Sequence, residues 1–141
     1  MKKLLPKLLL GLVAVLVLAQ LVRPEKTNPP VTGDVGAPPE VAAVLRRACY
    51  DCHSNETKWP WYSNVAPISW LVVRDVNEGR KHLNFSEWQS YEPKRQAHKL
   101  EETEGEVSEG EMPMAIYLPM HPEAKLSDAD KKLLVDWAKQ R

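Results

Sequence analysis

Cys49, Cys52 and His53 are the residues of this chain whose types and spacing could carry out a specific chemistry. They form the pattern Cys-x-x-Cys-His, with Tyr50 and Asp51 between the two thiols. Two thiols three positions apart can each add across a vinyl group on one edge of a porphyrin, and the adjacent histidine can then ligate iron. The pattern therefore predicts a covalently attached haem c at these three residues.

Three other uses of the cysteines compete with this interpretation. A thioredoxin-like dithiol needs a thiolate at a helix N-terminus, whereas here a helix is expected to run into the motif. A structural zinc site needs a second pair of ligands, and the three remaining histidines are scattered along the chain. A disulfide would close a ring so small that it stabilises little. Haem binding is favoured over all three.

The second axial ligand of the iron is less narrowly defined. Methionine or histidine could fill this position, and the candidates are Met112, Met114, Met120, His82, His98 and His121. Met112 is preferred because Pro113 follows it and stiffens a loop between two expected helices. Met120 and His121 are the main alternatives, and an open position is the remaining one. Methionines that do not ligate iron would pack around the haem.

The element that must position the motif is predicted to be a helix. Two prolines followed by Glu40 mark a helix start. Apolar residues then recur at helical spacing up to Cys52. Cys49 and Cys52 are therefore expected near the end of this first helix.

The later segments also read as helices joined by loops. A helix is predicted from Pro67 to Gly79, and a strongly charged one from Pro93 to about Val107. The inward side of the first of these should contain Ile68, Leu71, Val72, Asp75 and Val76. Residues 111–122 hold three prolines and three methionines and predict an irregular loop. Ser127 should cap the last helix, with Asp130 as its capping-box partner. Because no strand alternation is present, the fold class is predicted to be all-α.

The N-terminal residues predict that the protein is located outside the cytoplasm. Residues 1–22 have a short basic start and an apolar run, typical of a signal peptide or a membrane anchor. Residues 23–39 are rich in proline and predict an extended linker that spaces residues 40–141 from the membrane. The basic start favours a domain on the periplasmic side of the inner membrane, or free in the periplasm after cleavage.

Composition restricts the partners. Lys and Arg together equal Asp and Glu together at 19 each, and basic residues do not cluster as a nucleic-acid interface requires. The acidic stretch 101–111 is expected to be a solvated face that could steer a basic redox partner, and Asp51 is also expected to be solvated. The aromatic residues Trp59, Trp61, Tyr62, Trp70 and Trp88 could shield a porphyrin edge, although core packing is favoured.

Several segments resemble the bacterial haem-binding domain family of small c-type cytochrome-like proteins. They are CYDCHSNET at 49–57, WPWY at 59–62, APISW at 66–70, DVNEGR at 75–80, HLNFS at 82–86, GEMP at 110–113 and HPEAKLS at 121–127. The resemblance implies a cytochrome c-like helical fold with haem bound at Cys49 and Cys52 and ligated by His53. Met112 matches the Glu-Met-Pro position of the family.

The function expected from these features is one-electron transfer by a membrane-tethered or periplasmic monohaem cytochrome, which requires a redox partner protein. A haem-based sensor or small-ligand binder is the first alternative, and it needs an accessible iron. A peroxidase-like enzyme is the second alternative and needs acid–base groups that the sequence does not bring together. The several candidates for the sixth ligand favour electron transfer over catalysis.

Overall fold

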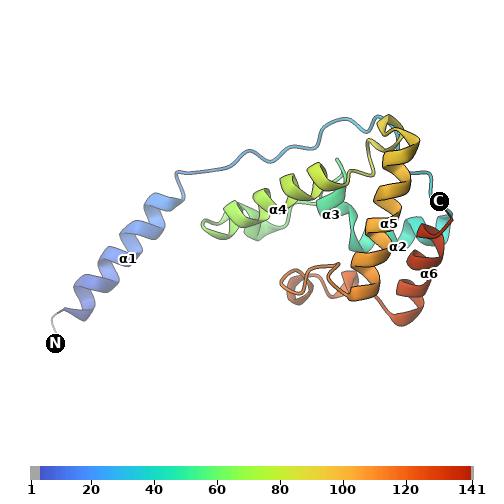
Figure 1. The fold of residues 1–141 in the computed structure, drawn as a ribbon. Helices are drawn as coiled ribbons and strands as arrows, with labels where there is room; N and C mark the ends of the chain where they lie inside the picture. Colours follow the sequence, from blue (N-terminus) through green and yellow to red (C-terminus); the bar gives the residue numbers. More distant parts are fainter. Residues whose placement is uncertain (1–3, 141) are drawn as a thin grey trace.

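The computed structural model describes residues 4–140, and within this range the chain is all-α as predicted (Figure 1). The α-helices are α1 Leu5–Ala19, α2 Pro39–Ala48, α3 Tyr50–His53, α4 Ile68–His82, α5 Pro93–Glu109 and α6 Asp128–Ala138. Short 3-10 helices are η1 Trp61–Asn64, η2 Trp88–Ser90, η3 Leu118–Met120 and η4 Pro122–Ala124. The basic residues Lys2 and Lys3, which support the predicted orientation, lie outside the described residues.

The hydrophobic core lies where α2, α5 and α6 meet. Leu45 of α2, Leu134 of α6 and Phe85 from the segment after α4 are almost completely buried. The ring of Phe85 stacks on Tyr50 with centroids 5.3 Å apart, so the core extends to the Cys-x-x-Cys-His motif. This packing supports the motif from one side.

The C-terminus of α5 and the N-terminus of α6 are formed by the residues that the sequence indicates. Gly110 ends α5 in the left-handed conformation with φ of 78°, which suits a residue without a side chain. The Ser127 hydroxyl accepts a hydrogen bond from the Asp130 N–H at 3.1 Å, and the Asp130 carboxylate accepts one from the Ser127 N–H at 2.9 Å. The predicted capping box is confirmed.

The inward side of α4 differs from the prediction. Its buried residues are Ser69, Val73 and Val76, whereas Ile68 and Leu71 are 48% and 51% exposed. The prediction is therefore confirmed for Val76 and wrong for Ile68 and Leu71. The two larger residues point away from the core.

Gly79 does not end α4, which continues to His82. A Cβ atom at Gly79 would lie 2.5 Å from the carbonyl oxygen of Cys52, closer than any side-chain atom can approach. Glycine is therefore needed at this position because α4 and α3 cross closely, and it does not mark the end of a helix.

The proline-rich linker is extended, as expected, but it is not a free spacer. Asn28 donates from its side-chain amide to the Thr57 carbonyl at 2.9 Å. The N–H groups of Thr32 and Gly33 both donate to the Ser86 carbonyl at 3.0 Å. These bonds hold the linker from Asn28 to Gly33 against the folded domain, so this part of the segment is not a free spacer.

α1 projects from the rest of the molecule (Figure 1). None of its residues is buried. No helix among residues 4–140 has both the length and the apolar content to cross a membrane.

Candidate functional site

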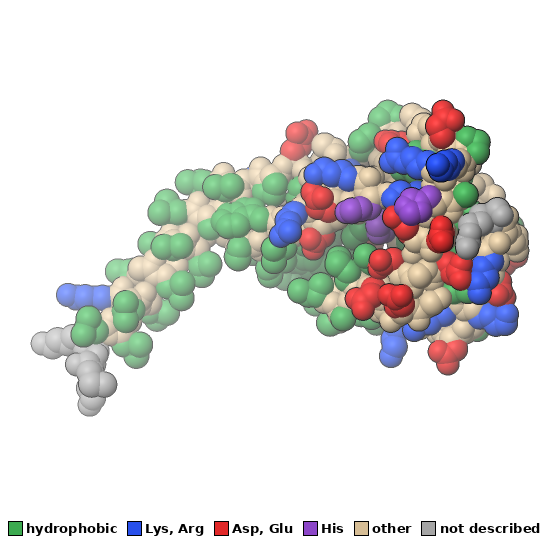
Figure 2. Space-filling view, viewed as in Figure 1, with side chains coloured by type: hydrophobic (Ala, Val, Ile, Leu, Met, Phe, Trp, Pro, Cys, Tyr) green, Lys and Arg blue, Asp and Glu red, His purple; other side chains and the backbone are tan. Residues whose placement is uncertain are grey.

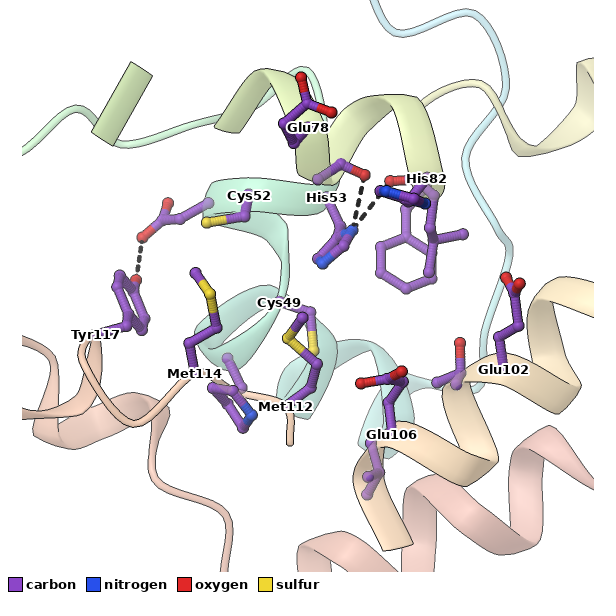
Figure 3. Close-up of a pocket in the computed structure, with 18 of the residues that line it drawn as sticks. Cys49, Cys52, His53, Glu78, His82, Glu102, Glu106, Met112, Met114 and Tyr117 are labelled. Atoms are coloured by element: carbon purple, nitrogen blue, oxygen red, sulfur yellow. Dashed lines mark hydrogen bonds between the residues drawn. The ribbon is translucent and has the colours of Figure 1, made fainter. Parts of the chain in front are cut away.

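A cavity of about 640 Å³ lies between α3, α4, α5 and the loop that follows α5. Cys49, Cys52, His53 and Met112 all line it (Figure 3), so the structure brings together the four residues predicted to hold haem. Cavities of roughly 300–1,000 Å³ are typical for small ligands and cofactors. The size and the lining residues therefore suit a bound prosthetic group.

The motif sits at a break between two helices. α2 ends at Ala48, and Cys49 has non-helical backbone angles before α3 begins. The His53 N–H donates to the Cys49 carbonyl at 2.9 Å, which closes a single helical turn around the motif. The turn brings both thiols and the imidazole to the cavity (Figure 3). The predicted position at the end of the first helix is confirmed, with the helix broken at Cys49.

The ring of His53 is held by two backbone carbonyls of α4 and the segment after it. Its Nδ1 lies 3.0 Å from the Gly79 oxygen and 3.1 Å from the Leu83 oxygen (Figure 3). Carbonyl oxygens only accept hydrogen bonds, so Nδ1 carries the proton and donates it. Nε2 is then left with a lone pair that a metal ion can accept.

Burial favours the neutral form of this imidazole. Desolvation lowers the pKa of His53, although the two backbone hydrogen bonds act in the opposite direction. The ring is therefore neutral at neutral pH. Neutral imidazole is the form that ligates iron.

The two thiols are free, and both have raised pKa values. Burial, followed by the proximity of Cys52, raises the pKa of Cys49 to about 12. Burial, followed by the charges of Asp51 and Asp75, raises the pKa of Cys52 to about 11. A dithiol oxidoreductase needs a thiol with a lowered pKa. The raised pKa values of the two thiols therefore disfavour the thioredoxin-like alternative.

Zinc is disfavoured on different grounds. Across residues 4–140, no group of three or more histidine, cysteine, aspartate or glutamate side chains is arranged to hold a metal ion. A structural zinc site needs four such ligands. Among the groups that line the cavity, the thioether sulfurs and the imidazole nitrogens are of the types that serve as axial donors of haem iron.

The methionines divide into two groups. Met112 and Met114 both line the cavity, and Figure 3 shows their side chains directed into it. Met120 is 55% exposed and does not line the cavity. Of the methionine candidates, the preferred Met112 and its neighbour Met114 are therefore in place at the cavity, and Met120 is not.

The histidine candidates are also separated by the structure. His121 uses both ring nitrogens: Nε2 lies 2.6 Å from the Tyr62 hydroxyl and Nδ1 lies 3.1 Å from a Glu123 oxygen. His98 faces Glu102 on the surface at 3.2 Å. Only His82 among these three lines the cavity. His121 is thus a structural residue beside the site.

Tyr117 joins the loop after α5, which carries Met112 and Met114, to the Cys-x-x-Cys-His motif. Its hydroxyl donates to the Asp51 carboxylate at 2.8 Å (Figure 3). The Lys58 N–H donates to the same carboxylate at 2.9 Å. Burial and the bond to Asp51 raise the pKa of Tyr117. Asp51 was predicted to be solvated, and this is wrong because its oxygens bind two donors from different segments. No local sequence signal connects residues 66 positions apart.

The aromatic residues for which core packing was favoured over shielding of a porphyrin edge do not line the cavity. Trp88 is buried in the core at 6% exposure, in agreement with the packing interpretation, but Trp61 is 71% exposed. Phe85 and Tyr117 are the aromatic residues at the cavity wall. Tryptophan content alone could not locate them.

The rim of the cavity is acidic. Carboxylates line it on α4 and α5, at Asp75, Glu78, Glu102, Glu106 and Glu109. Lys99 is the basic residue in the lining, and its Nζ lies 2.5 Å from Glu102. Part of the acidic stretch predicted to be a solvated face therefore borders the cavity and gives its entrance a negative potential.

The comparisons agree with this chemistry. A family model described as a haem-binding domain matches residues 14–140. Comparisons with curated proteins and with solved structures give no match. The match covers α2 to α6 and every residue that lines the cavity. The imidazole, thiol and thioether groups at the cavity fit the cofactor that the family binds, and the chain therefore belongs to the haem-binding domain family.

Proposed function

We propose that this protein carries one covalently attached c-type haem and transfers single electrons. The observation that supports the proposal best is the arrangement of Cys49, Cys52 and His53 on a single turn at the cavity wall. The ring nitrogen Nε2 of His53 is available for iron because Nδ1 is bound to backbone oxygens. Bound haem would supply an iron that alternates between the ferrous and ferric states.

The thiols are suited to covalent attachment. Both are free and line the cavity beside His53. Each thiol would add across one vinyl group, so that a C–S bond forms and the hydrogen is placed on the neighbouring carbon. This addition needs neither an oxidant nor a reductant, and it would fix the prosthetic group against the turn that carries His53.

Met112 is the proposed sixth ligand. Its N–H donates to the Glu106 carbonyl at 3.2 Å, so its backbone is held to the end of α5. A thioether ligand would close the iron against small molecules and raise its potential. Closure favours electron transfer over sensing or catalysis, and Met114 would then pack beside the ligand.

The acidic rim indicates the type of redox partner. Glu78, Glu102 and Glu106 lie around the cavity (Figure 3), where a basic protein surface would be attracted. We place the domain on the periplasmic side of the inner membrane because basic residues precede the apolar α1 in the sequence. α1 would associate the chain with that membrane.

Covalent attachment is tested by denaturing the chain after expression with the haem attachment machinery. The wild-type chain should keep its haem through denaturation and acid–solvent extraction, and its mass should increase by one haem. The double variant Cys49→Ser, Cys52→Ser should lose the haem during extraction. Haem that is extracted from the wild type would contradict a c-type linkage while leaving haem binding itself intact.

Electron transfer is tested by the absorption spectrum with carbon monoxide. The reduced wild type should be low-spin and unchanged by carbon monoxide, whereas Met112→Ala should bind it and lose the methionine-to-iron charge-transfer band. Met114→Ala is the matched control and should keep the band. Ready binding of carbon monoxide by the wild type would favour the small-ligand binder, and loss of the band in Met114→Ala alone would reassign the ligand.

A further inference from the structure

The corner between η1 and α4 exposes a group of large apolar side chains. Their exposed fractions are 71% for Trp61, 41% for Val65, 48% for Ile68 and 51% for Leu71. These four residues, named the corner patch below, lie within eleven consecutive positions. Single exposed apolar residues are ordinary on a protein surface, but a contiguous group of them marks an interaction site.

The corner patch is continuous with the apolar surface of α1. The Gln20 side chain accepts from the Ala66 N–H at 3.0 Å and donates to the Ala66 carbonyl at 3.1 Å. The indole N–H of Trp70 donates to the Val22 carbonyl at 2.8 Å. These three bonds join the end of α1 to the start of α4. Figure 2 shows hydrophobic side chains along α1 and on the adjoining end of the domain.

We propose that the corner patch contacts the surface of a lipid bilayer together with α1. α1 has 15 residues, none of them buried, and Lys7 is its one charged residue. Such a helix has no polar face to present to water, and lipid is the environment that covers all of its sides. Trp61 beside it is of the residue type that is enriched at membrane interfaces.

The charges beside the patch also suit lipid. Arg23 donates from Nε to the Gln20 carbonyl at 3.2 Å, and Lys26 binds the side chains of Ser63 and Asn64 in η1. Arg74 is exposed one turn after Leu71, and Glu25 is the acid in the same part of the linker. Basic residues next to an apolar surface attract the anionic headgroups of a bilayer.

Contact at the corner patch would orient the haem cavity. The patch occupies the first turns of α4, whereas Glu78, Gly79 and His82 line the cavity at its other end. On α4 the cavity lining begins at Asp75, one turn after Leu71, and Glu78 lies seven residues after Leu71, which corresponds to about 10 Å along a helix. Lipid contact at one end would therefore leave the acidic rim at the other end open to a basic partner. The inference rests on the proposed membrane association and is independent of the haem linkage.

The test uses the full chain in nanodiscs of phosphatidylglycerol, loaded with one chain each and exposed to hydroxyl radicals. Oxidation of each side chain is then measured by mass spectrometry. Trp61 should be oxidised about tenfold more slowly in the wild type than in the double variant Ile68→Asp, Leu71→Asp, because the two carboxylates would keep the corner out of lipid. Both substituted residues are about half exposed, so circular dichroism should show an unchanged fold.

A matched control comes from the other exposed apolar residues of the domain. Ile116 and Met120 are 78% and 55% exposed and lie in the loop after α5. The double variant Ile116→Asp, Met120→Asp should leave Trp61 protected, as in the wild type.

Three outcomes would overturn the proposal. If the wild-type chain elutes with the discs but Trp61 is oxidised as fast as in the corner variant, the patch does not contact lipid and only α1 does. If the chain does not elute with the discs, the membrane association fails as well. If protection appears only in discs with two chains, the corner binds a second copy of the protein.

Discussion

The two walls of the haem cavity are built in different ways. On the His53 wall, α3 and α4 approach closely at Gly79, and two backbone carbonyls hold the imidazole at 3.0 and 3.1 Å. On the opposite wall, Met112 and Met114 come from the loop after α5, which reaches the motif through the Tyr117–Asp51 bond. One wall is fixed by helix packing and the other by loop contacts.

Because of this difference, we expect the His53 wall to determine how firmly the cofactor is held and the methionine wall to determine access to the iron. The imidazole in the His53 wall is held in one orientation, since its Nδ1 lies within hydrogen-bond distance of the Gly79 carbonyl in α4 and of the Leu83 carbonyl just after it. The methionine wall offers two thioethers at neighbouring positions, and a loop can change its conformation at lower cost than packed helices. We expect mutations in the first wall to affect stability most, and mutations in the second to affect access to the iron.

The largest effect is expected for Gly79→Ala. Its Cβ would lie 2.5 Å from the Cys52 carbonyl oxygen, and backbone on both sides leaves little room for adjustment. We expect the free energy of unfolding to fall by about 3 kcal/mol, the upper part of the range for overpacking. Urea unfolding followed by circular dichroism measures this change.

Gly105→Ala provides the control for this prediction. Gly105 also lines the cavity from the interior of a helix, but a Cβ there would have nothing within 4 Å. Alanine should raise the free energy of unfolding by about 0.5–1 kcal/mol because it restricts the unfolded chain. Equal effects of the two substitutions would show that the crossing of α3 and α4 is not tight.

Local signals explain what the sequence predicted correctly. The capping box at Ser127, the left-handed glycine at position 110 and the motif at the end of a helix each depend on residues within one or two turns. The choice of Met112 as the sixth ligand also depended on a local feature, the proline after it; the structure places Met112 at the cavity, and its role as a ligand stays a prediction. These parts could be predicted because the residues that interact are close in the sequence.

Long-range contacts explain what the sequence missed. Hydrophobicity placed Ile68 and Leu71 inside, but both are about half exposed, and the smaller Ser69 is buried instead on another side of α4. The bond between Tyr117 and Asp51 and the linker bonds to Ser86 join segments far apart in the chain. Periodicity within one helix contains no information about such partners.

A smaller effect is expected for Tyr117→Phe in the methionine wall. The substitution removes the hydrogen bond to Asp51 at 2.8 Å and leaves the ring in place. Loss of a hydrogen bond to a charged group should reduce the free energy of unfolding by about 1.5 kcal/mol. Because the loop would then be less firmly attached to the motif, carbon monoxide should also bind the reduced protein faster, as stopped-flow absorption would measure.

Tyr62→Phe is the control for the loop. It removes the bond to His121 at 2.6 Å, which lies farther along the loop and does not involve the motif. It should lower stability without changing the rate of carbon monoxide binding. If both variants change that rate equally, the Tyr117–Asp51 bond has no special role in the methionine wall.

The smallest effect is expected for a substitution of Asp130, which is connected through Arg47 to the end of the loop after α5. Arg47 of α2 binds the Asp130 carboxylate at 2.6 Å and the Glu123 carbonyl at 3.0 Å, so it joins α6 to the end of the loop. Hydrogen bonds from Ser127, followed by the bond from Arg47, lower the pKa of Asp130 from 3.8 to about 2. The charged carboxylate is therefore the form that stabilises the fold.

The pH dependence of Asp130→Ala follows from this shift. Because the pKa is lower in the folded state, the stabilisation is complete above about pH 4 and is lost as the pH falls toward 2. The variant should be less stable than the wild type by about 1 kcal/mol at neutral pH, as for loss of a helix cap. This difference should shrink in urea unfolding experiments between pH 4 and 2. Asp128→Ala, which removes the same charge from the same turn of α6, should show a smaller difference at every pH. A difference for Asp130→Ala that stays constant down to pH 2 would mean that packing, and not the ionised carboxylate, supports this end of the methionine wall.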